Sequence, residues 1–137
     1  MQRRKTEHRA RSERGETLVE FAVSGLVFFM LVFATVEMGM VVWRYDFVSS
    51  LAQDGARWAS VHGATSLRPA SAADVAAYVQ TRSLGRTVGV VTTPAPSTVS
   101  PGGSINVVVQ ESMAPLSAFL PQIRFQLRGT AQMVVAR

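Results

Sequence analysis

An almost uninterrupted apolar run from Leu18 to Trp43 constrains this chain more than any other feature. Because a helix rises about 1.5 Å per residue, the run would extend about 39 Å, which exceeds the roughly 30 Å hydrocarbon core of a bilayer. The sequence therefore predicts a transmembrane helix that projects beyond the membrane. A cleaved secretory signal fits less well, because its apolar core covers about 7 to 15 residues and small residues follow it. Here the run is followed by Arg44 and Tyr45.

Basic residues are concentrated before this run. The chain has 14 Lys and Arg against 9 Asp and Glu, and six of the basic residues lie among the first fifteen positions. Cytoplasmic flanks of membrane helices carry the excess of Lys and Arg, so the N-terminus is predicted to be cytoplasmic and the C-terminal part to lie outside. The other residues include 8 basic and 7 acidic side chains and are nearly neutral. This distribution argues against nucleic acid as a partner.

The helix is predicted to continue beyond the membrane. Apolar residues recur at three- and four-residue steps after Tyr45, which predicts one helix over about residues 17–62, ended by Gly63. Its outer half is expected to be amphipathic and to pack against a sheet. The side chains expected to face that sheet are those of Val48, Leu51, Gly55 and Trp58.

The rest of the chain predicts a short helix and a small sheet. Ser71 followed three residues later by Asp74 is typical of a helix N-cap, and Gly85 would end that helix. Stretches that alternate or are rich in β-branched residues, separated by Pro and Gly, predict strands. These stretches are Arg86–Thr93, Ser104–Gln110, Gln122–Arg128 and Thr130–Ala136, with a bulge predicted at Gly129 between the last two. The predicted fold class is α+β, with a roughly three-stranded antiparallel sheet.

Three regions follow from these patterns. Residues 1–15 are predicted to be a basic cytoplasmic leader, residues 16–45 a transmembrane helix, and residues 46–137 an extracytoplasmic α+β domain. Within the last region, the apolar segment Met113–Leu120 would suit either a docking surface or a loop that folds back onto the sheet, which is the more ordinary arrangement.

A glycine and an acid stand at the start of the apolar run. Gly15 is followed five places on by Glu20, inside the beginning of the predicted membrane helix. A charged residue at a helix centre costs about 2.5 to 3.5 kcal/mol on insertion scales, and less near an interface, so Glu20 is expected to have a partner. The spacing of Thr17 and Glu20 is also that of a capping box, in which Glu20 would only accept a hydrogen bond from the Thr17 amide at a helix start.

Gly15 followed by Glu20 and Phe21 resembles the class III signal of type IV pilin-like proteins. In that signal a prepilin peptidase cuts after the glycine, and an acidic and an aromatic residue occupy the fifth and sixth positions of the mature protein. Further stretches resemble the tight-adherence branch, namely Val36-Glu37-Met38-Gly39, Asp54-Gly55-Ala56-Arg57-Trp58-Ala59 and Thr130-Ala131-Gln132-Met133. The chain therefore resembles the TadE-like family over most of its length, whereas the short major pilin of the same system resembles only its first half.

The resemblance implies a minor pilin or pilus-assembly component of the inner (cytoplasmic) membrane that can be incorporated in an extracellular pilus. Gly15 and Glu16 would form the processing site, and Glu20, Phe21 and Glu37 would act in assembly. The implied partners are a prepilin peptidase, other pilin subunits, the inner-membrane pilus machinery and membrane lipid. Glu16 departs from the family pattern, in which the first mature residue is more often neutral, and it could compete with Glu20 for the new α-amino group.

Two alternatives stay open at the level of the sequence. The chain could be an uncleaved, single-pass anchored envelope domain that acts by protein–protein binding. Glu37, 17 residues beyond Glu20, could contact a partner helix, or its carboxylate could simply reach outward to water among the lipid headgroups, which the sequence favours.

Catalytic chemistry finds little support in the sequence. The chain has no Cys, and its two histidines, His8 and His62, lie in the leader and at a predicted helix end. Neither a hydrolytic triad nor a metal site can be assembled from these residues, and no glycine-rich phosphate loop follows a strand. We therefore expect no enzyme activity, no cofactor and no metal.

Overall fold

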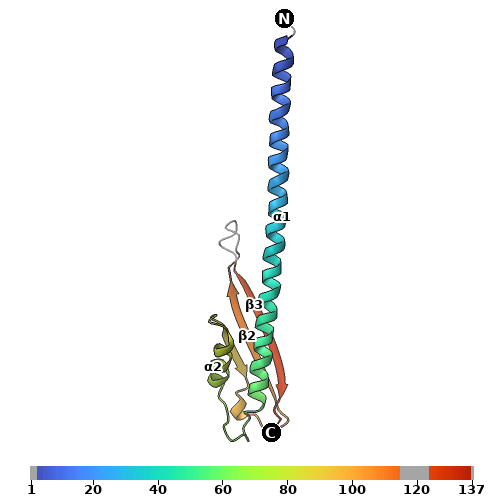
Figure 1. Cartoon of the computed structure of the whole chain (residues 1–137). Helices are drawn as coiled ribbons and strands as arrows, with labels where there is room; N and C mark the ends of the chain where they lie inside the picture. The colour runs from blue at the N-terminus through green and yellow to red at the C-terminus, as the bar shows by residue number, and fades with distance from the viewer. Residues whose placement is uncertain (1–2, 115–123, 137) are drawn as a thin grey trace. The chain divides into compact units, whose positions relative to one another are not determined.

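The computed structural model describes residues 3–114 and 124–136, with side chains described for 15–114 and 124–136. The elements are α1 (Arg3–Ser60), α2 (Ala72–Arg82), β1 (Gly89–Thr93), the 3-10 helix η1 (Pro96–Thr98), β2 (Ser104–Met113) and β3 (Phe125–Val134). A long N-terminal apolar helix, a short helix and a three-stranded antiparallel sheet confirm the predicted α+β class (Figure 1).

The chain forms two compact units, Met1–Gly39 and Met40–Arg137. The first consists of the N-terminal part of α1, and the second combines residues 40–60 of α1 with α2 and the sheet. Helix α1 runs without a break through the predicted boundaries after residues 15 and 45, so those boundaries stay predictions.

Helix α1 is longer at its start than the sequence predicted. It begins at Arg3 instead of near Thr17, and it ends at Ser60, two residues before the predicted end. The early start has a local reason, because the segment before Gly15 is rich in Arg, Lys and Glu, which have high helix propensity.

Helix α2 begins with the predicted capping box. The Ser71 hydroxyl accepts a hydrogen bond from the Asp74 amide at 3.2 Å, and the Ser71 amide donates to Asp74 Oδ2 at 2.8 Å. The Ser71 hydroxyl also donates to Oδ2 at 2.7 Å. These side-chain and backbone hydrogen bonds from Ser71 lower the pKa of Asp74 below its ordinary value. The helix ends at Arg82, and Gly85 follows with a φ of +79°, a conformation that favours glycine.

The capping carboxylate makes the stability of the domain depend on pH. Because the folded-state pKa of Asp74 lies below 3.8, its contribution is fully present above that value and is lost as the pH falls through the lower folded-state pKa. The unfolding midpoint of the wild type should therefore fall more steeply below pH 3.8 than that of an Asp74→Asn variant, measured by circular dichroism. Equal slopes for the two proteins would contradict a capping role for the charge.

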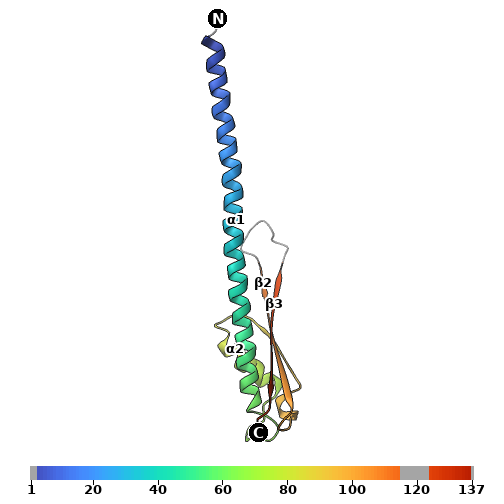
Figure 2. The same cartoon turned by 90° about the vertical axis from the view of Figure 1, so that its right-hand side faces the viewer.

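The sheet has the order β1-β2-β3, with both pairs antiparallel. Figure 2 shows β2 and β3 side by side along the C-terminal part of α1. β1 is shorter than predicted and starts at Gly89, whereas β2 extends three residues further than predicted, to Met113. Of the strand predicted from Gln122, the first residues, including Ile123, lie outside the described part of the chain.

The bulge predicted at Gly129 is wrong. β3 is a single ten-residue strand, and its register continues through Val109↔Gly129 and Val108↔Thr130 without an extra residue. The glycine has a different reason. A Cβ at this position would lie 2.6 Å from the Val48 carbonyl oxygen and 2.8 Å from the Ser49 Cα, so only glycine allows β3 to approach the backbone of α1.

The core of the 40–137 unit lies between α1, α2 and the sheet. Val48 and Leu51 are buried, as predicted, beside Ala52, Ala56 and Ala59 on the same helix. Gly55 is also buried, because a Cβ there would lie 2.7 Å from Val79 Cγ2 of α2 and 3.3 Å from Val107 Cγ1 of β2.

Trp58 differs from its prediction, because its indole faces α2 instead of the sheet. The ring stacks on Tyr78 of α2 at a centroid distance of 5.0 Å and on His62 at 4.1 Å. The short side chains of Ala56 and Ala59 are buried in the core, whereas Trp58 is only partly buried at its margin. Periodicity identified the amphipathic helix, but it could not distinguish which of two neighbouring elements would cover this ring.

Candidate processing and assembly site

The residues predicted for processing and assembly lie on an exposed stretch of α1. Gly15, Glu16, Glu20 and Phe21 are all exposed within the described chain, and the Phe21 side chain is 77% exposed. Glu16 and Glu20 are four residues apart in a continuous helix, which places both carboxylates on one side of it. The structure therefore brings two like charges together beside the predicted cleavage point.

Gly15 has no packing reason in the described chain. A Cβ added at this position would meet nothing within 4 Å, and its φ is not in the left-handed region. Gly129 and Gly55, in contrast, are each required by a neighbouring element. The described residues therefore do not explain the presence of glycine at position 15.

Thr17 does not cap the start of a helix in this structure. Helix α1 begins fourteen residues earlier, at Arg3, and passes through both Thr17 and Glu20. The alternative in which Glu20 serves a helix start therefore does not apply to the uncut chain.

Residues 18–38 of α1 have the exposed apolar surface of a membrane helix. Its large apolar side chains from Leu18 to Met38 are all exposed, and the least exposed of them, Val32, is still 41% accessible. The part of α1 from Gly15 to Ser60 contains a stretch long and apolar enough to cross a membrane, and none of that stretch is buried in the described chain. Length and composition thus support a membrane span, which the sequence predicted.

Two polar groups lie late in the apolar run. The Thr35 hydroxyl donates to the Leu31 carbonyl at 2.8 Å, so this group is satisfied within the helix itself. Glu37 is partly buried, and its role in assembly stays a prediction.

The structure contains a charged cluster near the end of the apolar run that the sequence did not predict. The Glu111 side chain on β2 is 7% exposed, and its Oε1 lies 3.5 Å from Arg44 Nη1 and 3.4 Å from Arg86 Nη1. The Arg86 guanidinium also lies over the rings of Trp43 and Phe47, 4.9 and 5.3 Å from their centroids. The alternation of Ile105, Val107 and Val109 could have predicted the burial of Glu111. Continued by one step, it places the side chain of residue 111 on the same buried face of the strand.

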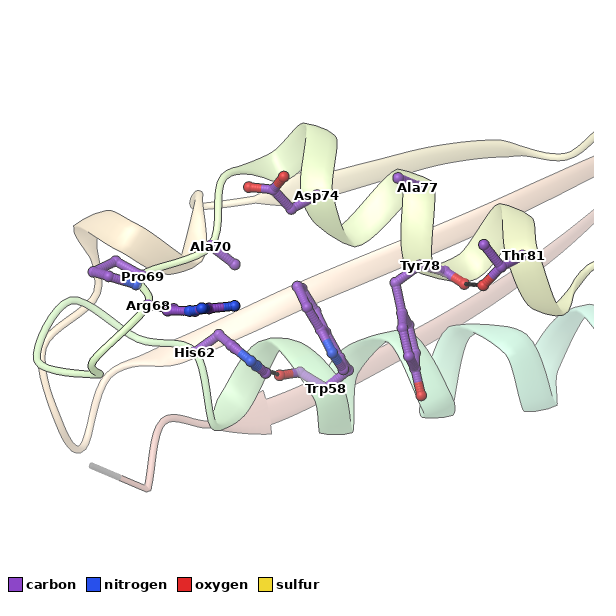
Figure 3. A pocket seen from close by; sticks show the side chains of 9 residues that line it. All are labelled: Trp58, His62, Arg68, Pro69, Ala70, Asp74, Ala77, Tyr78 and Thr81. Atoms are coloured by element: carbon purple, nitrogen blue, oxygen red, sulfur yellow. Dashed lines mark hydrogen bonds between the residues drawn. The ribbon is translucent and has the colours of Figure 1, made fainter.

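An open pocket of about 520 Å³ lies between the C-terminal end of α1, the loop before α2 and α2 itself (Figure 3). Trp58, His62 and Tyr78 form its aromatic side, and Arg68 and Asp74 contribute charges of opposite sign. His62 Nδ1 lies 2.7 Å from the Trp58 carbonyl oxygen. Among the side chains described for 15–114 and 124–136, no group of three or more His, Cys, Asp or Glu could hold a metal ion.

Comparison with known protein families adds one finding to this geometry. The family model described as TadE-like protein matches residues 15–57, from the predicted cleavage glycine to the amphipathic half of α1. No curated protein and no solved structure was found to match the chain. The family match supports a pilus-associated component of a tight-adherence system, and with the apolar helix it supports membrane anchoring. Over residues 15–57, this chain is therefore similar to the TadE-like family, the family that its sequence resembles.

Proposed function

We propose that the chain is a minor pilin or pilus-assembly component of a tight-adherence pilus, and that a prepilin peptidase cleaves it after Gly15. The observation that carries this proposal is the start of the family match at Gly15, which leaves the basic segment outside it. Gly15 is exposed and has no packing role in the described chain, which is compatible with cleavage at this point. The protein would act as a structural subunit of the inner membrane and not as an enzyme, with the N-terminus in the cytoplasm and the sheet domain outside.

Cleavage would supply a partner for Glu20. Hydrolysis of the Gly15–Glu16 peptide bond leaves a carboxylate on Gly15 and an α-amino group on Glu16, whose usual pKa of about 7.7 to 8.0 keeps it mostly protonated near neutral pH. The Glu20 carboxylate of one subunit can then pair with the amino terminus of a neighbouring subunit. Because an unpaired carboxylate is costly in hydrocarbon, this pairing favours one register between adjacent helices.

One observation favours a second candidate function. The family match ends at residue 57, and the sheet, α2 and most of the core residues of the 40–137 unit lie beyond it. An uncleaved anchor that binds a protein partner through this domain would need only the membrane helix and not the processing site.

The mass of the N-terminus of the protein extracted from native membranes distinguishes these functions. A chain that starts at Glu16 supports the pilin proposal. A chain that retains the first fifteen residues, in cells with an active prepilin peptidase, contradicts it and favours the anchored domain.

Replacing Gly15 by leucine should abolish processing. A peptidase that cuts after glycine must accommodate the residue before the cut, and leucine adds four carbon atoms there. The precursor of Gly15→Leu should accumulate to nearly the whole population on an immunoblot. Gly25→Leu is the matched control, because a Cβ at Gly25 also meets nothing within 4 Å and this residue lies within the apolar run. Normal processing of Gly15→Leu would show that the cut lies elsewhere.

A further inference from the structure

The Arg44–Glu111–Arg86 cluster lies where the predicted membrane span ends, and its charges do not balance. By sequence, the apolar run ends at Trp43, directly before Arg44. Two guanidinium groups share the single carboxylate of Glu111, which leaves a net charge of +1 in the cluster. Basic residues normally concentrate on the cytoplasmic flank of a membrane helix, whereas Arg44 and Arg86 lie at its predicted outer end.

The two arginines are held at fixed positions. The Arg86 carbonyl accepts hydrogen bonds from Gln80 Nε2 at 2.8 Å and from the hydroxyl of the fully buried Ser83 at 2.7 Å. The guanidinium of Arg86 lies over the rings of Trp43 and Phe47, which stack with each other. Because both Arg44 Nη1 and Arg86 Nη1 lie within 3.5 Å of Glu111 Oε1, they are separated by at most twice that distance. One phosphate group can therefore bridge them with two of its oxygens.

The surroundings of the cluster favour an anion from the membrane. Each arginine side chain is 26% exposed, so each retains an accessible part. Asp46 is the nearest other acid along α1, and at 100° per residue it lies on the far side of the helix from Arg44. Trp43 and Tyr45 are 58% and 50% exposed, and such rings are enriched at the level of lipid headgroups.

We propose that Arg44 and Arg86 form a binding site for the phosphate group of an anionic phospholipid in the outer leaflet, with Trp43 beside it as an interfacial anchor. Glu111 has a positioning role: it holds the two guanidinium groups together and partly offsets their charge. The site depends on the membrane span and not on cleavage or pilus assembly, so it can exist in either of the two proposed functions.

The test is native mass spectrometry of the full chain in a neutral detergent with an equimolar mixture of phosphatidylglycerol and phosphatidylcholine. The measured quantity is the ratio of the two lipids retained. The wild type should prefer phosphatidylglycerol, and Arg44→Gln and Arg86→Gln should each lower the preference about fivefold, since a basic residue near the membrane surface contributes about 1 kcal/mol. Arg57→Gln is the control, because Arg57 is an exposed arginine on the same helix outside the cluster. All variants share the basic segment of residues 1–15, so its attraction for anionic lipid cancels in the comparison.

Glu111→Gln separates lipid binding from a purely structural ion pair. Glutamine keeps an oxygen that can accept hydrogen bonds from both guanidinium groups, but it removes the competing negative charge. The preference for phosphatidylglycerol should therefore increase if the arginines bind lipid. An unchanged or lower preference in Glu111→Gln, or equal ratios for Arg44→Gln, Arg86→Gln and Arg57→Gln, would overturn the proposal. Displacement of phosphatidylglycerol by millimolar inorganic phosphate would assign the site to free phosphate and also overturn the lipid assignment.

Discussion

Replacing Glu20 by alanine should leave membrane insertion intact and abolish incorporation into a filament. Insertion becomes easier, because the variant no longer places a carboxylate in hydrocarbon, which costs up to about 2.5 to 3.5 kcal/mol at a helix centre. Incorporation is lost because the amino terminus of the neighbouring subunit has no carboxylate to pair with. The amount of the protein in sheared pilus fractions should fall at least about tenfold, which corresponds to a loss of only about 1.4 kcal/mol per subunit contact.

Glu16→Ala is the matched control for this experiment. Glu16 lies on the same side of α1 and is also exposed, but it would carry the new amino group and is not proposed to pair with a neighbour. Its removal should leave incorporation unchanged or raise it, because a competing carboxylate disappears. Wild-type incorporation of Glu20→Ala, with processing at Gly15 intact, would show that the acid has no role in assembly.

Replacing Gly129 by valine should unfold the sheet domain or strongly lower its free energy of unfolding. Valine normally favours strands, so the sequence alone would suggest a neutral or stabilising change. In the structure, however, the new Cβ would lie 2.6 Å from the Val48 carbonyl oxygen, and the nearest atoms belong to the helix backbone, which cannot turn away as a side chain could. Overpacking of this kind costs about 1 to 3 kcal/mol and occasionally more, and we expect valine here to reach the upper end.

Pulse proteolysis of the detergent-extracted protein in urea measures this loss of unfolding free energy. Thr130→Val is the control, because Thr130 is the next residue of β3 and its side chain is exposed. The control should change the unfolding free energy by no more than about 0.5 kcal/mol. Similar values for the two variants would mean that β3 and α1 do not approach as closely as the structure shows.

The Glu111 cluster connects the fold to the proposed membrane contact. Arg44 directly follows the apolar run, and the structure pairs it with a nearly buried acid from β2. This pairing is compatible with a membrane contact, because it uses one nitrogen of each guanidinium and the side chains stay partly exposed. A structural ion pair can in this way also orient two arginines toward a lipid phosphate.

The sequence by itself determined the features whose causes are local. The apolar run follows from composition and length, and the capping box of Ser71 and Asp74 follows from two side chains three residues apart. The α+β class and the TadE-like resemblance also needed no contacts between distant residues. The processing and assembly roles proposed for Gly15 and Glu20 also rest on the sequence, because in the described chain both residues are exposed and a Cβ at Gly15 would meet no neighbour.

The tertiary structure decided what depends on the approach of elements far apart in the chain. A glycine in a strand can indicate either a bulge or a close approach of another backbone, and the sequence predicted a bulge at Gly129. Only the packing of β3 against α1 shows that this glycine is required by close contact with Val48. Trp58 faces α2 because α2, and not the sheet, lies beside that side of α1. Glu111 meets Arg44 and Arg86 across 67 and 25 residues of chain, a convergence that no local pattern contains. Such contacts are fixed by how helices and strands fill a common core, which a one-dimensional periodicity does not specify.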